Sequence, residues 1–136
     1  MDKLNIPNIS CQISAYCQVN PSEDPQKVEH AISNVLSNMD IYIKDDSLKA
    51  TSKTLESLLH IHEIIHSRNI YKVYGRNLKR NLVYDSTWFY LNKQAAFVDV
   101  VTLCENADES PLGPIKVILQ SKHIENIIDW LISSSQ

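Results

Sequence analysis

Apolar and polar side chains alternate with period two over residues 9–19, which predicts a half-buried strand. The spacing then changes, because over residues 28–39 apolar side chains recur three or four positions apart, as on the buried side of an amphipathic helix. Residues 40–44 alternate again and predict a second strand. A turn at residues 45–47 follows this strand and leads into a brief extended piece.

Two helices are predicted in the middle of the chain. The first begins after Ser52 or Thr54, either of which can cap it, and it ends near Ser67. The second covers about residues 68–81. Gly75 lies inside this second helix and costs about 1 kcal/mol of helix stability relative to alanine, which weakens the prediction that the helix is continuous.

The last third of the chain predicts three strands and a closing helix. A helical turn separates the first two strands, and an acidic loop with two prolines separates the last two. Ser121 can cap the closing helix. In chain order the segments are strand 86–91, turn 92–96, strand 97–104, loop 105–114, strand 115–120 and a helix that ends near residue 131.

This order of elements predicts an α+β fold. Short links between the later strands favour antiparallel neighbours, and the helices must then gather mostly on one face of the sheet. We find no internal repeat and no linker. We therefore assign residues 1–136 to one domain, with an ordered core over about residues 9–131.

Composition narrows the class of protein. The hydrophobic fraction of 43% is sufficient for a core, and no apolar run approaches the roughly 20 residues that a membrane span requires. The N-terminal residues also lack the apolar segment of a secretion signal, so we expect a cytoplasmic protein with no membrane partner. The three cysteines form no C-x-x-C pair and are expected to be small apolar core residues. We expect no cofactor.

Residues 62–66 read His-Glu-Ile-Ile-His and fit the H-E-x-x-H pattern of zinc peptidases. Such a site needs a third ligand, but the positions that would supply one hold Asn69 and Lys72, and residues 67–84 contain no Asp, Glu or His. The two histidines fall in the same helical sector as the apolar stripe. We therefore interpret them as packed side chains, expect no metal site, and rank a zinc hydrolase as the weakest hypothesis.

Positive charge is concentrated in one segment of a chain whose net charge is −3. No acidic residue occurs between Glu63 and Asp85. Four of the basic residues there recur every fourth position, which predicts one stripe on one helix that can meet phosphates. The alternative is a solvated face that pairs with the acidic remainder of the chain or with a second subunit. The candidate nucleic-acid-binding residues are Arg68, Lys72, Arg76, Lys79 and Arg80.

Aromatic residues define another candidate surface. Trp88 and Tyr90 lie on one side of the predicted strand, and Phe89 and Leu91 lie on the other. If helices cover only one face of the sheet, one of these pairs lies on the open face. Rings on an open sheet can stack with bases or can be buried against a twin subunit, and the sequence favours the second interpretation.

Three segments together resemble the archaeal uncharacterised protein family 0201: residues 19–25, 89–96 and 109–115. The resemblance implies a five-stranded antiparallel sheet with about five helices. It also implies a likeness in fold to the large-subunit ribosomal protein that binds 5S RNA and to the RNA-recognition superfamily. The family is labelled RNA-binding because of this likeness in shape. Its most characteristic polar residues here are Asn92, Lys93 and Gln94, for which we expect a structural turn with Asn92 as a helix cap and Gln94 bonded to backbone.

The sequence thus favours a non-catalytic interaction module that forms a homodimer. RNA binding through the basic helix stripe is the alternative, and no catalytic residue is assigned.

Overall fold

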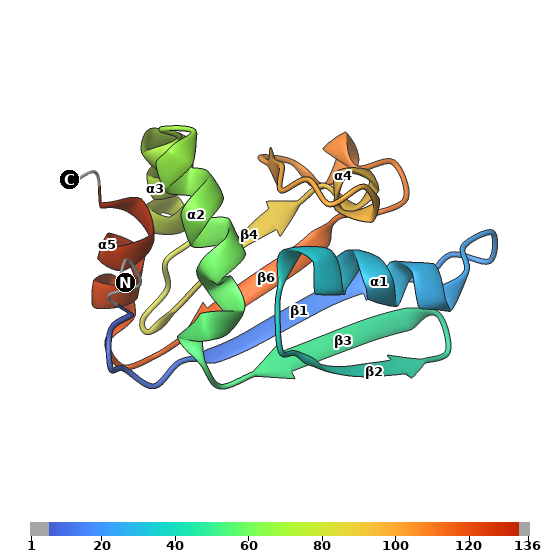
Figure 1. Cartoon of the computed structure of the whole chain (residues 1–136), viewed down its shortest axis with the longest axis horizontal. Helices are drawn as coiled ribbons and strands as arrows, with labels where there is room; N and C mark the ends of the chain where they lie inside the picture. Colours follow the sequence, from blue (N-terminus) through green and yellow to red (C-terminus); the bar gives the residue numbers. More distant parts are fainter. Residues whose placement is uncertain (1–5, 134–136) are drawn as a thin grey trace.

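A computed structural model describes residues 6–133 and contains one antiparallel sheet of six strands (Figure 1). The strand order is β2-β3-β1-β6-β4-β5. The strands are β1 (Gln12–Gln18), β2 (Asp40–Lys44), β3 (Ser47–Ser52), β4 (Ser86–Leu91), β5 (Leu103–Cys104) and β6 (Ile115–Gln120). Five α-helices accompany them in this part of the chain: α1 (Pro25–Val35), α2 (Leu59–Ser67), α3 (Tyr71–Arg80), α4 (Lys93–Phe97) and α5 (Ile124–Ile132).

The predicted α+β class is confirmed, but the expected five-stranded sheet is wrong. The brief extended piece after residue 44 is a complete strand, β3, which lies between β2 and β1. A two-residue turn joins β2 to β3, and Asp45 in this turn has a φ of 57°. Only Leu48 and Ala50 of β3 are buried apolar residues, so the hydrophobic pattern is too weak to predict a full strand from sequence.

The strand predicted over residues 97–104 is also wrong for most of its length. Phe97 ends α4, and only Leu103 and Cys104 pair with β4. The chain turns at Asp99, whose φ is 63°, and the Val98 side chain is 71% exposed. The valines of this segment favour a strand locally, but the chain must reverse here to return to the edge of the sheet.

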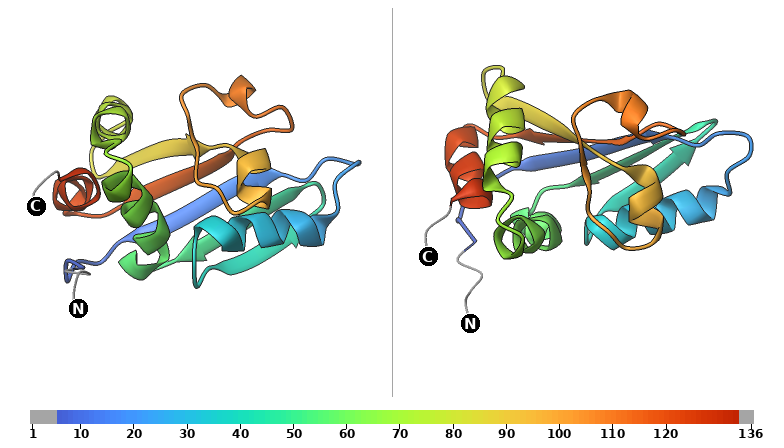
Figure 2. Two further views of the ribbon diagram at one scale, coloured as in Figure 1. Left: turned by 45° about the horizontal axis from the view of Figure 1, so that its top comes forward. Right: turned by 90° about the horizontal axis from the view of Figure 1, so that it is seen from above.

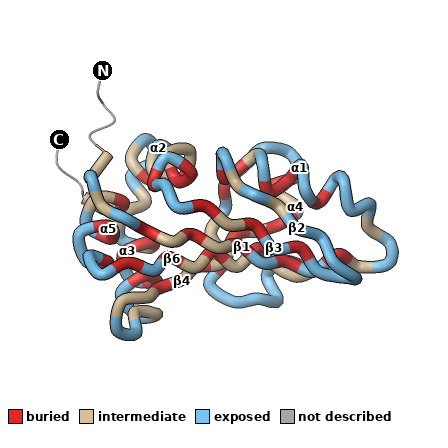
Figure 3. The backbone as a smooth tube through the Cα atoms, turned by 90° about the horizontal axis from the view of Figure 1, so that it is seen from below, coloured by how far each residue is buried: buried red, intermediate tan, exposed pale blue. Residues whose placement is uncertain are grey.

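Helices α1, α2 and α4 cover one face of the sheet, whereas α3 and α5 lie at one end of it (Figure 2). Over the described residues no helix covers the opposite face, which we call the open face. Buried and less buried residues alternate along the strands, as Figure 3 shows. The covered side includes Cys11 and Cys17, as predicted, and burial raises the pKa of each thiol to about 11.

The two central helices are separated rather than continuous. Helix α2 ends before Arg68, and the chain turns at Asn69, whose φ is 53°. Helix α3 is continuous through Gly75, which is buried. A Cβ atom at Gly75 would lie 2.9 Å from Cδ1 of Ile132, so the glycine allows α3 to lie close to α5. Each described helix, from α1 to α5, falls short of the length and apolar character needed to cross a bilayer.

Candidate functional site

A line of directly opposed residues crosses five strands on the open face. On the central strand, Tyr16 lies opposite Lys49 of β3 on one side and Lys116 of β6 on the other. The outer partners of these lysines are Tyr42 of β2 and Tyr90 of β4. We call this set the aromatic–lysine row: Tyr42, Lys49, Tyr16, Lys116 and Tyr90.

Two lysines of the row lie over aromatic rings. Directly opposed side chains in an antiparallel sheet have Cβ atoms about 5 Å apart, so neighbours in the row are close enough to interact. Lys49 Nζ lies 5.6 Å from the centre of the Tyr16 ring. Lys116 Nζ lies 4.6 Å from the centre of the Trp88 ring, and Trp88 lies 4.9 Å from Tyr90. At these distances each ammonium group makes a cation–π contact with a ring. Both lysines lie on the open face.

The rings of this surface differ in their exposure. Tyr42 is 60% exposed and Tyr16 is 38% exposed, whereas Trp88 and Tyr90 are half-buried. Phe89, their neighbour on β4, points into the core. The sequence correctly separated the two sides of β4, and the structure places the Trp88 side on the open face.

The open face carries positive charge although the whole chain has a net charge of −3. Three lysines occupy strand positions that point to the open face: Lys44, Lys49 and Lys116. Among the strand positions on this face, one residue is acidic, Asp40 at the edge of the sheet. None of these lysines was a candidate from sequence. Their outward positions can be read from the alternation of each strand, but their alignment requires the strand order β2-β3-β1-β6-β4.

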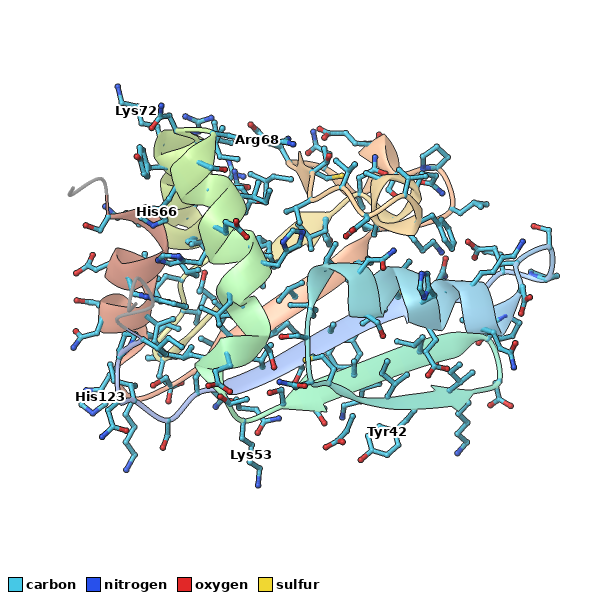
Figure 4. The ribbon with its side chains drawn as sticks, in the orientation of Figure 1. Tyr42, Lys53, His66, Arg68, Lys72 and His123 are labelled. Carbon is cyan, nitrogen blue, oxygen red and sulfur yellow. The ribbon has the colours of Figure 1, made fainter. Side chains whose placement is uncertain are left out.

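Four of the five residues of the predicted basic stripe lie on one helix, and Arg68 does not. Arg68 follows the end of α2, while Lys72, Arg76, Lys79 and Arg80 belong to α3. Figure 4 shows Arg68 and Lys72 where these two helices meet, far from β2. The turn at residue 69 separates Arg68 from the other residues of the stripe, whereas Lys72, Arg76 and Arg80 keep their four-residue spacing on α3.

Two of the α3 arginines already have partners. Arg76 Nη2 lies 3.5 Å from Glu105 Oε2, and both side chains are substantially exposed. Arg80 Nη2 donates a hydrogen bond of 2.8 Å to Asn77 Oδ1. An exposed ion pair of this kind contributes about 0–1 kcal/mol, so it costs little to break, but it reduces the charge that α3 presents to a polyanion.

Lys93 lies in a buried cluster that connects three loops. Its side chain is 0% exposed, and Nζ donates hydrogen bonds to Glu23 Oε1 at 3.0 Å, Gln18 O at 2.9 Å and Leu112 O at 2.9 Å. Glu23 also accepts two bonds from Asn20, through its backbone N–H and its side-chain amide. Burial would raise the pKa of Glu23, but the hydrogen bonds from Asn20 and Lys93 outweigh it and leave this pKa below its ordinary value.

The neighbours of Lys93 also have structural contacts. Asn92 Oδ1 accepts a hydrogen bond of 2.9 Å from Ala95 N and caps α4, as predicted. Gln94 does not bond to backbone through its oxygen as expected, because Gln94 Oε1 accepts a hydrogen bond of 2.9 Å from Ser110 Oγ. The Ser110 hydroxyl also accepts a bond from Lys93 N. This short polar segment therefore fastens α4 to the loop before β6.

The histidines of the H-E-x-x-H pattern stack on each other. The ring centres of His62 and His66 are 4.2 Å apart, and His62 also stacks on Trp130 of α5 at 4.4 Å. Burial and the neighbouring His66 lower the pKa of His62 to about 4. Across residues 6–133 no group of three His, Cys, Asp or Glu side chains is placed to hold a metal ion. The geometry favours packing between α2 and α5.

Comparison with known proteins relates the chain to one family. A family model described as RNA binding matches residues 12–121. A UPF0201 protein of Methanothermobacter thermautotrophicus is 38% identical over 121 residues, which cover 88% of this chain and 89% of the relative. A UPF0201 protein of Sulfurisphaera tokodaii is 37% identical over 118 residues, covering 84% and 81% of the two chains.

Solved structures show the same arrangement. The crystal structure of a UPF0201 protein from Methanococcus jannaschii aligns with a TM-score of 0.77 at 25% identity, covering 92% of this chain and 95% of that one. Protein AF2318 from Archaeoglobus fulgidus, of family model DUF54, aligns with a TM-score of 0.69 at 19% identity over 88% and 96% of the two chains, and shares the fold. The chain belongs to the UPF0201 family, whose model carries the description RNA binding.

Proposed function

We propose that this protein is a non-enzymatic, cytoplasmic RNA-binding protein that holds single-stranded RNA across the open face of its sheet. The observation that carries the proposal is the aromatic–lysine row, in which rings and cations alternate across five strands. Exposed aromatic rings stack with bases, and lysines between them neutralise phosphates. This combination is typical of surfaces that bind single-stranded nucleic acids.

The spacing of the row suits an extended strand of RNA. Adjacent strands in a sheet lie about 4.8 Å apart, so rings on every second strand are separated by roughly 10 Å. A lysine occupies each interval, at Lys49 and at Lys116. In a duplex the bases are stacked on each other and cannot reach the rings, so the row selects for unpaired RNA.

The family model that matches residues 12–121 supports the proposal by its description, RNA binding. The charge of the open face also favours RNA binding over a face-to-face homodimer as the role of these rings. Two copies packed face to face would oppose Lys49 and Lys116 with the same lysines, which is unfavourable. The aromatic side of β4 therefore fits a polyanion better than it fits a twin subunit.

Two charge-reversal variants with the same net charge test the proposal. One variant carries Lys49→Glu and Lys116→Glu in the aromatic–lysine row, and the other carries Arg76→Glu and Arg80→Glu on α3. Binding of a labelled, unstructured RNA oligonucleotide is measured by fluorescence anisotropy over a range of salt concentrations. The wild-type affinity should fall with salt, with a logarithmic slope of about −1.4 if these two lysines meet phosphates.

We expect the row variant to lose binding and the α3 variant to retain most of it, although both change the charge of the protein equally. Circular dichroism confirms that each variant is folded. If wild-type protein does not bind the oligonucleotide at low salt, the proposal is wrong. If the α3 variant loses as much affinity as the row variant, the basic residues of α3 carry the binding and the open face does not.

A further inference from the structure

The strand β2 forms a free edge of the sheet, and we propose that two copies of the chain pair there, β2 against β2, to make a homodimer. The strand lies at the end of the order β2-β3-β1-β6-β4-β5 and is exposed at every position except Ile41. A free edge presents unpaired backbone N–H and C=O groups that can bind another strand. The proposal goes beyond RNA binding and does not depend on it.

Charge complementarity fixes the arrangement. The sequence of β2 is Asp-Ile-Tyr-Ile-Lys, from Asp40 to Lys44. If two copies run antiparallel with Tyr42 opposite its twin, Asp40 of each copy lies opposite Lys44 of the other. Two ion pairs of opposite charge form, and no like charges meet. A shift of two residues in either direction would lose both pairs.

The backbone of β2 favours the same register. Lys44 and Ser47 close the two-residue turn, and Ser47 Oγ donates to Lys44 O at 3.3 Å, so this carbonyl faces β3. Hydrogen bonding alternates along an antiparallel strand, and therefore Ile41 and Ile43 direct their N–H and C=O groups to the free edge. Pairing about Tyr42 matches Ile41 of each copy with Ile43 of the other, so all four residues find backbone partners.

The side chains at the edge also gain burial. Ile43 is 39% exposed and lies on the helix-covered side beside Ile41, so the isoleucines of the two copies would cover each other. On the open face, Tyr42 extends beyond the edge of the molecule (Figure 4) and would meet its twin. The two aromatic–lysine rows would then join into one. Because each strand has five residues, the interface is small and the dimer should dissociate on dilution.

Charge variants test the register. Asp40→Lys alone and Lys44→Asp alone each place like charges opposite each other and should weaken self-association, measured by sedimentation equilibrium over a dilution series, by about tenfold or more. A mixture of the two single variants should associate again, because the lysine pair of one chain then meets the aspartate pair of the other. Failure of the mixture to recover association overturns the proposed register.

Cross-linking tests the contact at the two-fold axis. A Tyr42→Cys variant should form an intermolecular disulfide under mild oxidation, because opposed residues of this kind have Cα atoms about 4.5 Å apart. The three native cysteines are buried and contribute little background. Tyr84→Cys, at a site that is 94% exposed and outside the sheet, is the matched control. Equal cross-linking of the two variants, or monomeric wild-type protein at every concentration, overturns the proposal.

Discussion

The ammonium group of Lys116 lies 4.6 Å from the centre of the Trp88 ring, on the open face of the sheet. The contact joins a group that can bind phosphate to a ring that can stack with a base. It also places an intrinsic fluorophore beside the proposed RNA. Trp130, the other tryptophan of the chain, lies on α5 against His62, away from this face.

The two tryptophans should therefore respond differently to RNA. In a Trp130→Phe variant, where Trp88 supplies the signal, an unstructured oligonucleotide should quench the emission because a base approaches the indole ring. In a Trp88→Phe variant the emission of Trp130 should change little. A fluorescence titration measures both. Equal quenching in the two variants would show that RNA does not bind beside Trp88.

Substitution at the centre of the row should weaken binding without changing its salt dependence. Tyr16→Thr removes the central ring and keeps a residue that favours strands. Loss of one stacked base costs about 1–3 kcal/mol, so we expect the affinity for RNA to fall by about tenfold. The slope of affinity against salt should stay constant because no charge is removed.

The control for this substitution is Tyr84→Asn, which removes a ring that is 94% exposed at a position with a φ of 57°, where asparagine fits well. The control should bind RNA as the wild type does. An equal loss of affinity in both variants would mean that exposed rings act without regard to the row.

The sequence located most elements because their hydrophobic patterns are local. The alternation of β1 and β4 and the helical spacing of α1 are visible in short windows. It gave β3 only as a brief extended piece, because Leu48 and Ala50 are the only buried apolar residues of this strand, and it joined α3 to Arg68 because the left-handed turn at Asn69 leaves no strong local signal. The aromatic–lysine row could not be predicted, since Tyr16 and Lys116 become neighbours only through long-range pairing of β1 with β6.

Removal of the buried lysine should destabilise the protein strongly. Lys93→Met leaves the carboxylate of Glu23 buried without its cationic partner and removes the lysine's hydrogen bond to the carbonyl of Gln18, whereas the carbonyl of Leu112 keeps its hydrogen bond from Asn20 Nδ2. Breaking a buried ion pair in this way costs about 3–5 kcal/mol of unfolding free energy. Urea denaturation measures this loss.

Two further variants separate the ion pair from general effects. Lys27→Met, at an exposed position of α1, should change the free energy of unfolding by no more than about 0.5 kcal/mol. The double variant with Lys93→Met and Glu23→Gln should be less destabilised than the sum of its single substitutions, because no lone charge remains. Additive losses would contradict a direct coupling between Lys93 and Glu23.

The packed histidine should make the protein less stable in mild acid. Burial against Trp130 and the proximity of His66 lower the pKa of His62 from 6.5 to about 4 in the folded chain. Between these values the unfolded chain binds more protons than the folded one. Stability is therefore retained above pH 6.5 and lost as the pH falls toward 4. Because the ring is only partly buried, the loss is on the order of 1 kcal/mol.

Trp130 reports this titration directly. In a Trp88→Phe background its emission should fall as the stacked imidazole becomes a cation, because imidazolium quenches indole fluorescence, and the midpoint should lie at about pH 4. His62→Phe in the same background keeps a ring against the indole but removes the proton-binding site, so its emission should not change over this range. Circular dichroism shows whether the fold is retained at each pH. A midpoint near the ordinary value of 6.5 would mean that His62 is solvated and that α2 and α5 are not packed through it.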